Sequence, residues 1–224
     1  MGDVAVTLLP VIAGATLVPV YPIVVLLLLQ SQRGLGKALA FVTGAVAVRL
    51  VQGILFGFVF GAAAEAYPDG GSEVIAATLL LVIGILLLIG AYKKWRNEAD
   101  PDEPTPRWMA TISSLSAPKA VGTGALLLAA SVKQWVFTLT AIDVIQGAEL
   151  GTTSSVALYL LYTGATQVLV LLPILLVAVA PQRSAQTLTA AQSWLERNNR
   201  VILVTASLVF GVWFFYKGIS GLMG

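Results

Sequence analysis

Six apolar stretches, separated by short polar breaks, make up most of the sequence. They cover roughly residues 4–29, 38–64, 74–92, 120–146, 155–180 and 201–222. Each is about as long as the ~20 residues that an α-helix needs to cross a bilayer. The chain is therefore expected to be an all-α membrane protein with six transmembrane helices.

The polar breaks alternate in the sign of their charge. Lys and Arg occur in the first, third and fifth breaks, at residues 31–37, 93–119 and 181–200, whereas the N-terminus and the second and fourth breaks carry only acidic residues. Cytoplasmic loops of membrane proteins retain basic residues. The alternation predicts a multi-pass protein of the plasma (inner) membrane, with its basic loops in the cytoplasm and both termini outside.

Composition argues against several classes of protein. Charged residues make up 11% of the chain, against about 25% in a typical globular protein, and 13 basic and 11 acidic residues are too evenly balanced for nucleic-acid binding. The sequence contains no Cys and no His, which removes disulfides, thiolate metal sites and the usual proton shuttle. The nearest candidate nucleophile and base, Ser131 and Lys133, do not share a helix face. We expect no metal, no cofactor and no enzymatic activity.

The longest break divides the chain into two groups of three spans. We predict a first three-helix repeat at 1–92, a cytoplasmic linker at 93–119 and a second repeat at 120–224. Thr78–Gly84 resembles Thr205–Gly211, and each segment is followed by a Tyr-Lys pair. An odd number of spans makes such repeats inverted in the membrane, and transporters built in this way bind substrate near the midplane, often at broken helices.

The second repeat is expected to contain an amphipathic helix at 182–200. Its predicted apolar face consists of Leu188, Ala191, Trp194 and Leu195. At the end of the linker, apolar residues recur at helical spacing over 108–115, which fits a membrane-surface helix and a short connector equally well.

Pro19 and Pro22 interrupt the first apolar stretch. Proline removes a backbone donor and clashes with the preceding turn, so the helix must kink or open here. In lipid the freed carbonyls need partners in protein or water, which places this stretch inside the bundle, and Tyr21 adds a hydroxyl at the break. A packing kink is the alternative to a functional break. Because no basic region precedes this apolar run, we expect it to be retained rather than cleaved as a signal peptide.

Two cations lie deep inside predicted spans. Arg49 belongs to the second span, with Gln52 on the same helix face, and Lys133 is followed by Gln134 in the middle of the fourth. A buried cation costs at least about 2.5–3.5 kcal/mol at the bilayer centre, and both side chains start too far from a helix end to reach the head groups. We expect each to face a polar cavity.

The acid well inside a span is Asp143, ten residues after Lys133 and about 15 Å further along a continuous helix. Arg49 and Lys133 therefore outnumber the acids at midplane depth, and an anionic ligand such as a phosphate, sulfate or carboxylate would neutralise them. Gln167, with Tyr162 and Thr163 nearby, would add uncharged hydrogen-bonding groups. Asp143 is either a coupling group or a partner of one cation, and a buried ion pair that only locks the helices together is the structural alternative.

Several short motifs occur in a fixed order along nearly the whole chain. They are Pro19–Leu26, Gln32–Gly34 and Phe41–Gly44 in the first half, and Leu171–Pro173, Val179–Pro181 and Trp194–Asn198 in the second. In these motifs the chain resembles the peptidoglycolipid-addressing (GAP, or Sap-like) proteins, a branch of the lysine-exporter superfamily of six-span carriers. That family usually carries an Asn-Pro-Lys-Asn-like motif in the fourth span, where this chain has Ser131-Val-Lys-Gln134. The Lys is retained but the Pro is not, which puts a break in this helix in doubt.

The resemblance implies export or translocation of cell-envelope glycolipids or their precursors. Our leading hypothesis is a transporter that moves an anionic amphiphile by alternating access around a cationic midplane site. Its predicted substrate-binding residues are Arg49, Gln52, Lys133, Gln134, Tyr21 and Gln167, and its coupling or gating residues are Asp143, Pro19 and Pro22.

Two alternatives stay open. A small-solute exporter of the lysine-exporter type would bind a zwitterion, with Lys133 at its carboxylate and Asp143 at its ammonium group. A non-transporting envelope-assembly protein would use the buried charges structurally. The expected partners are the membrane and a lipid or anionic amphiphilic substrate, without nucleic acid, and a homodimer is among the expected assemblies.

Overall fold

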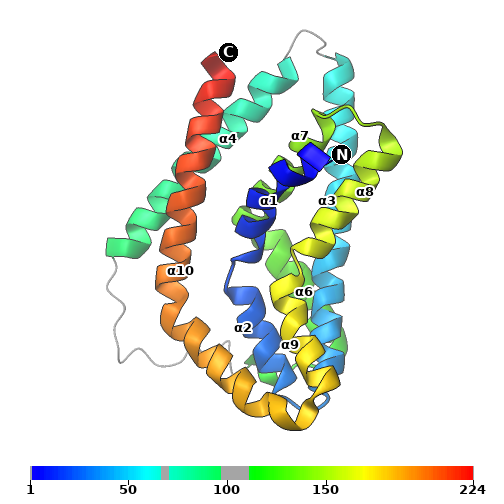
Figure 1. The fold of residues 1–224 in the computed structure, drawn as a ribbon, viewed down its shortest axis with the longest axis vertical. Helices are drawn as coiled ribbons and strands as arrows, with labels where there is room; N and C mark the ends of the chain where they lie inside the picture. Colours follow the sequence, from blue (N-terminus) through cyan, green and yellow to red (C-terminus); the bar gives the residue numbers. More distant parts are fainter. Residues whose placement is uncertain (1, 67–70, 97–110, 224) are drawn as a thin grey trace.

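The computed structural model describes residues 2–66, 71–96 and 111–223, and the regular elements within these ranges are α-helices. The helices, in chain order, are α1 (Gly2–Thr16), α2 (Val20–Leu29), α3 (Gly34–Ala66), α4 (Gly71–Arg96), α6 (Ala117–Ala130), α7 (Val132–Gln146), α8 (Thr152–Ala165), α9 (Val168–Val179) and α10 (Pro181–Met223). Figure 1 shows them as one elongated bundle, with α4 and α10 along one side.

Length and apolar composition identify up to five candidate membrane spans in the described part of the chain. Residues 34–57 of α3 and 186–223 of α10 each suffice as one span, and the other three candidates are bent pairs of helices. The pairs are α1 with α2, bent by 59°, α6 with α7, bent by 72°, and α8 with α9, bent by 60°. The remaining expected span, 74–92, falls on α4. The prediction of an all-α membrane protein is confirmed, whereas the number of six crossings stays a prediction.

The first bend lies where the prolines predicted it. α1 ends at Thr16 and α2 begins at Val20, with Pro19 at the N-cap position of α2 and Pro22 buried in its first turn. Proline is tolerated in the first turn of a helix, where its missing N–H would have no intrahelical acceptor. The first span is therefore two helices, and Pro19 starts the second of them.

The doubt about a break in the fourth span was wrong. Ser131, with φ −83° and ψ 99°, leaves the helical conformation between α6 and α7 although no Pro is present, and its hydroxyl accepts a hydrogen bond from the backbone N–H of Gln134 at 3.4 Å. Serine is a favoured N-cap because its side chain satisfies a backbone donor that a new helix leaves unpaired. Here a capping serine starts the new helix without the help of a proline.

Buried apolar side chains form two clusters on opposite sides of these breaks. One cluster is built by α2, α3, α6, α9 and the start of α10, and includes Val24 and Phe41. The other is built by α1, α7, α8 and the later part of α10, and includes Phe137 and Phe214. Each broken span contributes one of its helices to each cluster. The breaks therefore lie at the boundary between the two apolar cores.

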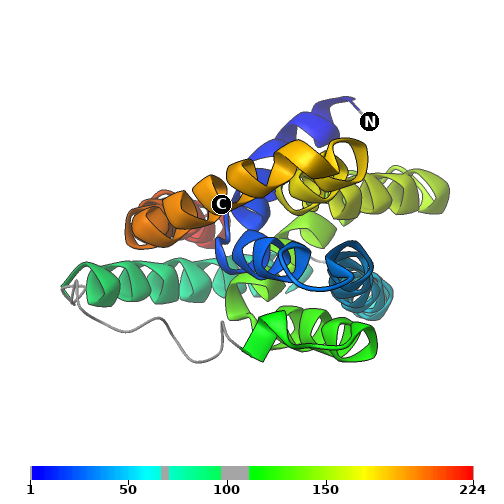
Figure 2. The same ribbon diagram turned by 90° about the horizontal axis from the view of Figure 1, so that it is seen from below.

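Glycines let α4 and α10 approach each other closely. A Cβ atom added to Gly84 would lie 2.5 Å from the backbone nitrogen of Phe215 and 3.0 Å from the carbonyl oxygen of Gly211. One added to Gly211 would lie 3.3 Å from the carbonyl oxygen of Gly84. These two glycines hold corresponding positions in the two similar sequence segments, and they meet where the two helices pack. Seen from below, α4 and the later part of α10 occupy the side of the molecule away from α3 and α8, whereas the first part of α10 crosses under the bundle (Figure 2).

The predicted amphipathic segment is helical and continues into the last span without a break, as part of α10. Leu188 is buried, and Ala191 and Leu195 pack against the first apolar cluster. Trp194 was expected on this face but is 54% exposed, because it lies about 120° around the helix from Leu188 at 100° per residue. In the linker, Ile112 is buried and Leu115 packs beside it, whereas residues 97–110 lie outside the described part of the chain.

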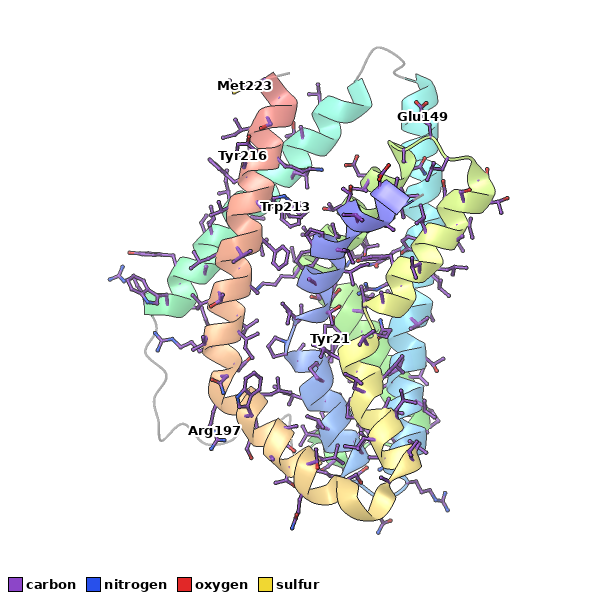
Figure 3. All side chains as sticks on the ribbon, in the orientation of Figure 1. Tyr21, Glu149, Arg197, Trp213, Tyr216 and Met223 are labelled. Carbon is purple, nitrogen blue, oxygen red and sulfur yellow. The ribbon has the colours of Figure 1, made fainter. Side chains whose placement is uncertain are left out.

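The charged ends of the bundle agree with the alternation of the polar breaks. The two termini lie toward one end (Figure 1). Glu149 and Met223 lie toward that end, and Arg197 lies at the opposite one (Figure 3). Which end faces the cytoplasm stays a prediction.

Candidate functional site

Arg49 is the centre of a buried polar network between the two apolar cores. The side chain is 1% exposed and lies on α3. Its Nη1 donates to the hydroxyls of Tyr162 at 3.1 Å and Thr166 at 2.9 Å, and its Nη2 donates to Oε1 of Gln134 at 2.5 Å. These partners come from α7 and α8 and from the residue that follows α8. The described residues thus supply the guanidinium with uncharged partners, which orient the cation without neutralising it.

The network reaches all three helix breaks. Gln134, in the first turn of α7, donates from Nε2 to the carbonyl oxygen of Ala15 at 2.9 Å, one residue before the end of α1. Thr166 is the C-cap residue of α8, and Gln167 is the N-cap residue of α9. Arg49 therefore binds groups at the ends of helices from two bent spans directly, and Gln134 connects it to the end of α1 in a third. Broken helices with their polar ends directed at a common point are a frequent arrangement of transporter binding sites.

Parts of this network have no hydrogen-bond partner. Nε of Arg49 is buried without one, and so are both amide atoms of Gln52, whose side chain is 2% exposed. Leaving a buried donor or acceptor unsatisfied costs about 1–3 kcal/mol for each group. Buried polar groups are otherwise almost always paired, with protein or with ordered water. The unpaired groups of Arg49 and Gln52 lie one helical turn apart on α3 and offer both donors and an acceptor to a further ligand.

One distant side chain and one neighbouring side chain satisfy carbonyls at the end of α6. The hydroxyl of Tyr21 donates to the carbonyl oxygen of Leu127 at 3.2 Å, and Nε1 of Trp135 donates to that of Ala129 at 2.6 Å, both in the last turn of α6. Tyr21, predicted to bind substrate, is 7% exposed and packs near Phe41 (Figure 3). In this conformation Tyr21, which lies at the break in the first span, stabilises the break in the fourth span through its hydroxyl.

Lys133 lies beside a different part of the bundle. Its Nζ donates to the hydroxyl of Ser207 on α10 at 2.7 Å, whereas its neighbour Gln134 turns to Arg49. Consecutive residues of a helix point about 100° apart, so the two side chains separate. Lys133 lines a small pocket with a cavity volume of about 10 Å³, between Gly14 on α1 and Phe210 on α10. The structure thus gives the two predicted cations separate surroundings.

The remaining predicted residues lie around the network or further along α7. Gln167 is 7% exposed, and its Nε2 donates to the hydroxyl of Thr166 at 3.4 Å, which places it one contact away from Arg49. Asp143 is half-buried on α7, nine residues beyond Gln134, and its carbonyl accepts the bond that caps the helix at Gly147. Pro19 and Pro22 shape the first break and contribute no side-chain hydrogen bond.

Three residues of the site were not predicted: Thr166, Tyr159 and Ser207. The hydroxyl of Tyr159 donates to the backbone carbonyl of Arg49 at 2.6 Å. A pattern in the fifth span could have found two of them, since Tyr159, Tyr162 and Thr166 recur at intervals of three and four residues and so share one helix face. Ser207 has no such signal, because it is a single hydroxyl in a long apolar helix.

Comparison with known proteins gives one family. The family model described as Sap, sulfolipid-1-addressing protein, matches residues 8–220 of the chain. Searches of curated proteins and of solved structures found no significant match.

Proposed function

Because the chain belongs to the Sap, sulfolipid-1-addressing protein family, a family of membrane proteins implicated in sulfolipid addressing, we propose that it transports an anionic amphiphile across the plasma membrane by alternating access. The anionic group binds at Arg49, Gln52 and the adjoining amides. A sulfolipid carries a negatively charged sulfur-oxygen group, and this charge is opposite to the positive charge of Arg49. The proposal does not extend to enzymatic activity.

One observation carries this proposal. Arg49 is almost completely buried, its described partners are uncharged, and its Nε and the whole amide of Gln52 remain unpaired. A protein that only needed to neutralise this cation would place a carboxylate against it, because unpaired buried charge is expensive. In a site that binds an anion, the donors of Arg49 and Gln52 stay oriented and the positive charge stays unneutralised until the anion binds.

The arrangement of the helices supports an inverted repeat. If the first three spans correspond to the last three, then α4 and α10 are equivalent, and a helix pair related by an axis in the membrane plane must cross at equivalent residues. Gly84 and Gly211 correspond in sequence and meet where α4 and α10 pack. The corresponding first and fourth spans are both broken. The second and fifth spans differ, since the fifth is bent and the second is continuous. Alternating access through an inverted repeat would use two such halves.

The experiment that tests this function is mass spectrometry of lipids that co-purify with the full chain in mild detergent. The wild-type protein should retain an anionic amphiphile at a higher ratio than the bulk membrane contains. Arg49→Met should lose this enrichment, and Arg49→Lys, which keeps the charge, should retain part of it. If Arg49→Met fails to fold, Gln52→Leu replaces it. A wild-type protein without anionic enrichment, or a folded Arg49→Met variant that keeps it, would refute the proposal.

The small-solute exporter remains a second candidate because Lys133 lies apart from the Arg49 network, beside a pocket of its own. The cavity of this pocket is only about 10 Å³, room for about one water molecule, so a small carboxylate would enter only if the helices moved apart. Asp143, however, is not among the residues that line it, so the ammonium group of a zwitterion would need another partner. The same mass spectrometry separates the two candidates, because it reports polar metabolites as well as lipids.

A further inference from the structure

One feature that the proposed function leaves unexplained is a groove on the outside of the bundle, between α3, α7 and α8. Its cavity volume is about 670 Å³, within the ~300–1,000 Å³ of typical ligand pockets. It runs along α3 from Leu50 to Gly57 and along α8 from Thr152 to Leu160. At 1.5 Å per residue each stretch is about 10–12 Å long, which is most of one leaflet, since the hydrocarbon core is about 30 Å thick.

The groove is apolar toward the middle of the bundle and polar at its end. The part toward the middle of the bundle is lined by Leu50, Ile54, Ile142 and Leu160, of which Ile54 and Leu160 are exposed. The end near the loop after α7 is lined by Gln146, Glu149, Thr152 and Ser155. Glu149 lies at the end of the bundle that also holds Met223 (Figure 3). A membrane lipid has this polarity, with its head group at the surface and its chain toward the midplane.

Bare backbone and one aromatic ring form the floor of the groove. Gly53 has no side chain there because a Cβ atom would overlap the ring of Tyr159. At Gly57 a Cβ atom would find its nearest neighbour, Nε2 of Gln146, at 3.9 Å, and that same amide donates to the Gly57 carbonyl oxygen at 3.1 Å. Tyr159 therefore separates the groove from the Arg49 network, to which its hydroxyl is bound.

We propose that this groove binds a membrane lipid whose head group carries hydroxyls and no negative charge, such as a glycosyl lipid, with one acyl chain lying over Gly53 and Gly57. The carboxylate of Glu149 accepts hydrogen bonds from head-group hydroxyls, and the hydroxyls of Thr152 and Ser155 and the amide of Gln146 complete the polar end. The negative charge of Glu149 disfavours an anionic phosphate in the same place. The chemistry of this site is thus opposite in sign to that of Arg49, and the site does not depend on the proposed transport function.

The test is photo-crosslinking of the full chain in phosphatidylcholine vesicles with two probes that share the same diazirine-bearing acyl chains. One probe is glucosyl-diacylglycerol and the other is phosphatidylglycerol. Mass spectrometry of peptides should show that the glucosyl probe labels residues 50–57 and 142–160 about tenfold more than phosphatidylglycerol, a ratio equivalent to about 1.4 kcal/mol. Glu149→Gln should raise labelling by phosphatidylglycerol toward that by the glucosyl probe.

A blocking variant completes the test. Gly57→Phe places a ring in the groove at a position with room for its Cβ, and it should reduce labelling by both probes severalfold. Gly122→Phe on α6 is the matched control, because a Cβ atom there meets nothing within 4 Å and lies outside the groove. Val156→Trp serves as a second block if Gly57→Phe does not fold. Equal labelling of the wild type by both probes, or undiminished labelling in a folded blocking variant, would overturn the proposal.

Discussion

Gln52→Leu should make the protein more stable while it removes anion binding. Gln52 is 2% exposed, and both amide atoms are buried without a hydrogen-bond partner. Each unsatisfied group costs about 1–3 kcal/mol, so a leucine of similar size should stabilise the protein by about 2 kcal/mol or more. For a chain of this length 1 kcal/mol corresponds to about 2–4 °C in Tm, which gives an expected rise of about 4–8 °C. Such exchanges of stability for activity are common at functional sites.

The matched control is Gln134→Leu, which replaces an equally buried glutamine that is fully bonded. Its loss would leave Nη2 of Arg49 and the carbonyl of Ala15 without partners, a cost of about 2–5 kcal/mol and a lower Tm. Thermal unfolding in detergent, followed by size-exclusion chromatography, measures both variants, and lipid mass spectrometry measures their anion enrichment. A Gln52→Leu variant that unfolds at a lower temperature than the wild type would show that its amide is satisfied, and the anion-site reasoning would fail.

Three further outcomes are expected. Lys133→Met should fold and express normally but lose transport, measured by the lipid or metabolite content of purified protein and vesicles; failure to fold would indicate a structural role instead. Gly84→Leu should lower the Tm, because overpacking typically costs about 1–3 kcal/mol and its Cβ would meet the α10 backbone, whereas Gly90→Leu, with nothing within 4 Å, should not. The pair Ala77→Cys and Gly221→Cys should oxidise to a disulfide that leaves lipid binding intact. A Cβ at Gly221 would lie 2.9 Å from that of Ala77, so the helices need to separate by about 1 Å to reach the ~3.5–4.5 Å between Cβ atoms of a disulfide. A gel shift on reduction detects the bond, and lost binding would show that α4 and α10 must slide.

The bends illustrate how far the sequence predicts the fold. The break in the first span follows from Pro19, a local steric constraint that can be read directly from the sequence. The break at Ser131 has local contributions from the serine cap and from Trp135, which binds a carbonyl six residues earlier. It also depends on Tyr21, which is 106 residues away from its acceptor and which no local pattern predicts. The break after α8 likewise ends at Thr166, whose hydroxyl binds the carbonyl of Thr163 and also accepts from Arg49. Tertiary contacts stabilise these two breaks.

The same limit applies to the site. The cost of burying a charge in a bilayer identifies Arg49 and Lys133 from the sequence as side chains that need polar partners. Arg49 has a polar network, whereas Lys133 has the Ser207 hydroxyl in a pocket lined mainly by apolar residues. Their assignment to one common cavity was a prediction from span depth alone, and depth does not fix the direction of a side chain around its helix. Gln134, one residue from Lys133, is the side chain that binds Arg49 across 85 residues of sequence. The rotation of α7 about its axis decides which side chain reaches Arg49, and helix packing sets that rotation.

The position of the polar layer explains why this fold tolerates a buried cation. An uninterrupted apolar core would expose Arg49 to hydrocarbon on every side. The three bends divide the core in two, and the ends of their helices bring Gln134, Thr166 and the carbonyl of Ala15 to the same level. Each of these groups lies at the end of a different bent pair, and Gln134 connects Arg49 to Ala15. Under the proposed function, an anion at Arg49 would compete with these contacts, and this competition would couple binding to helix rearrangement.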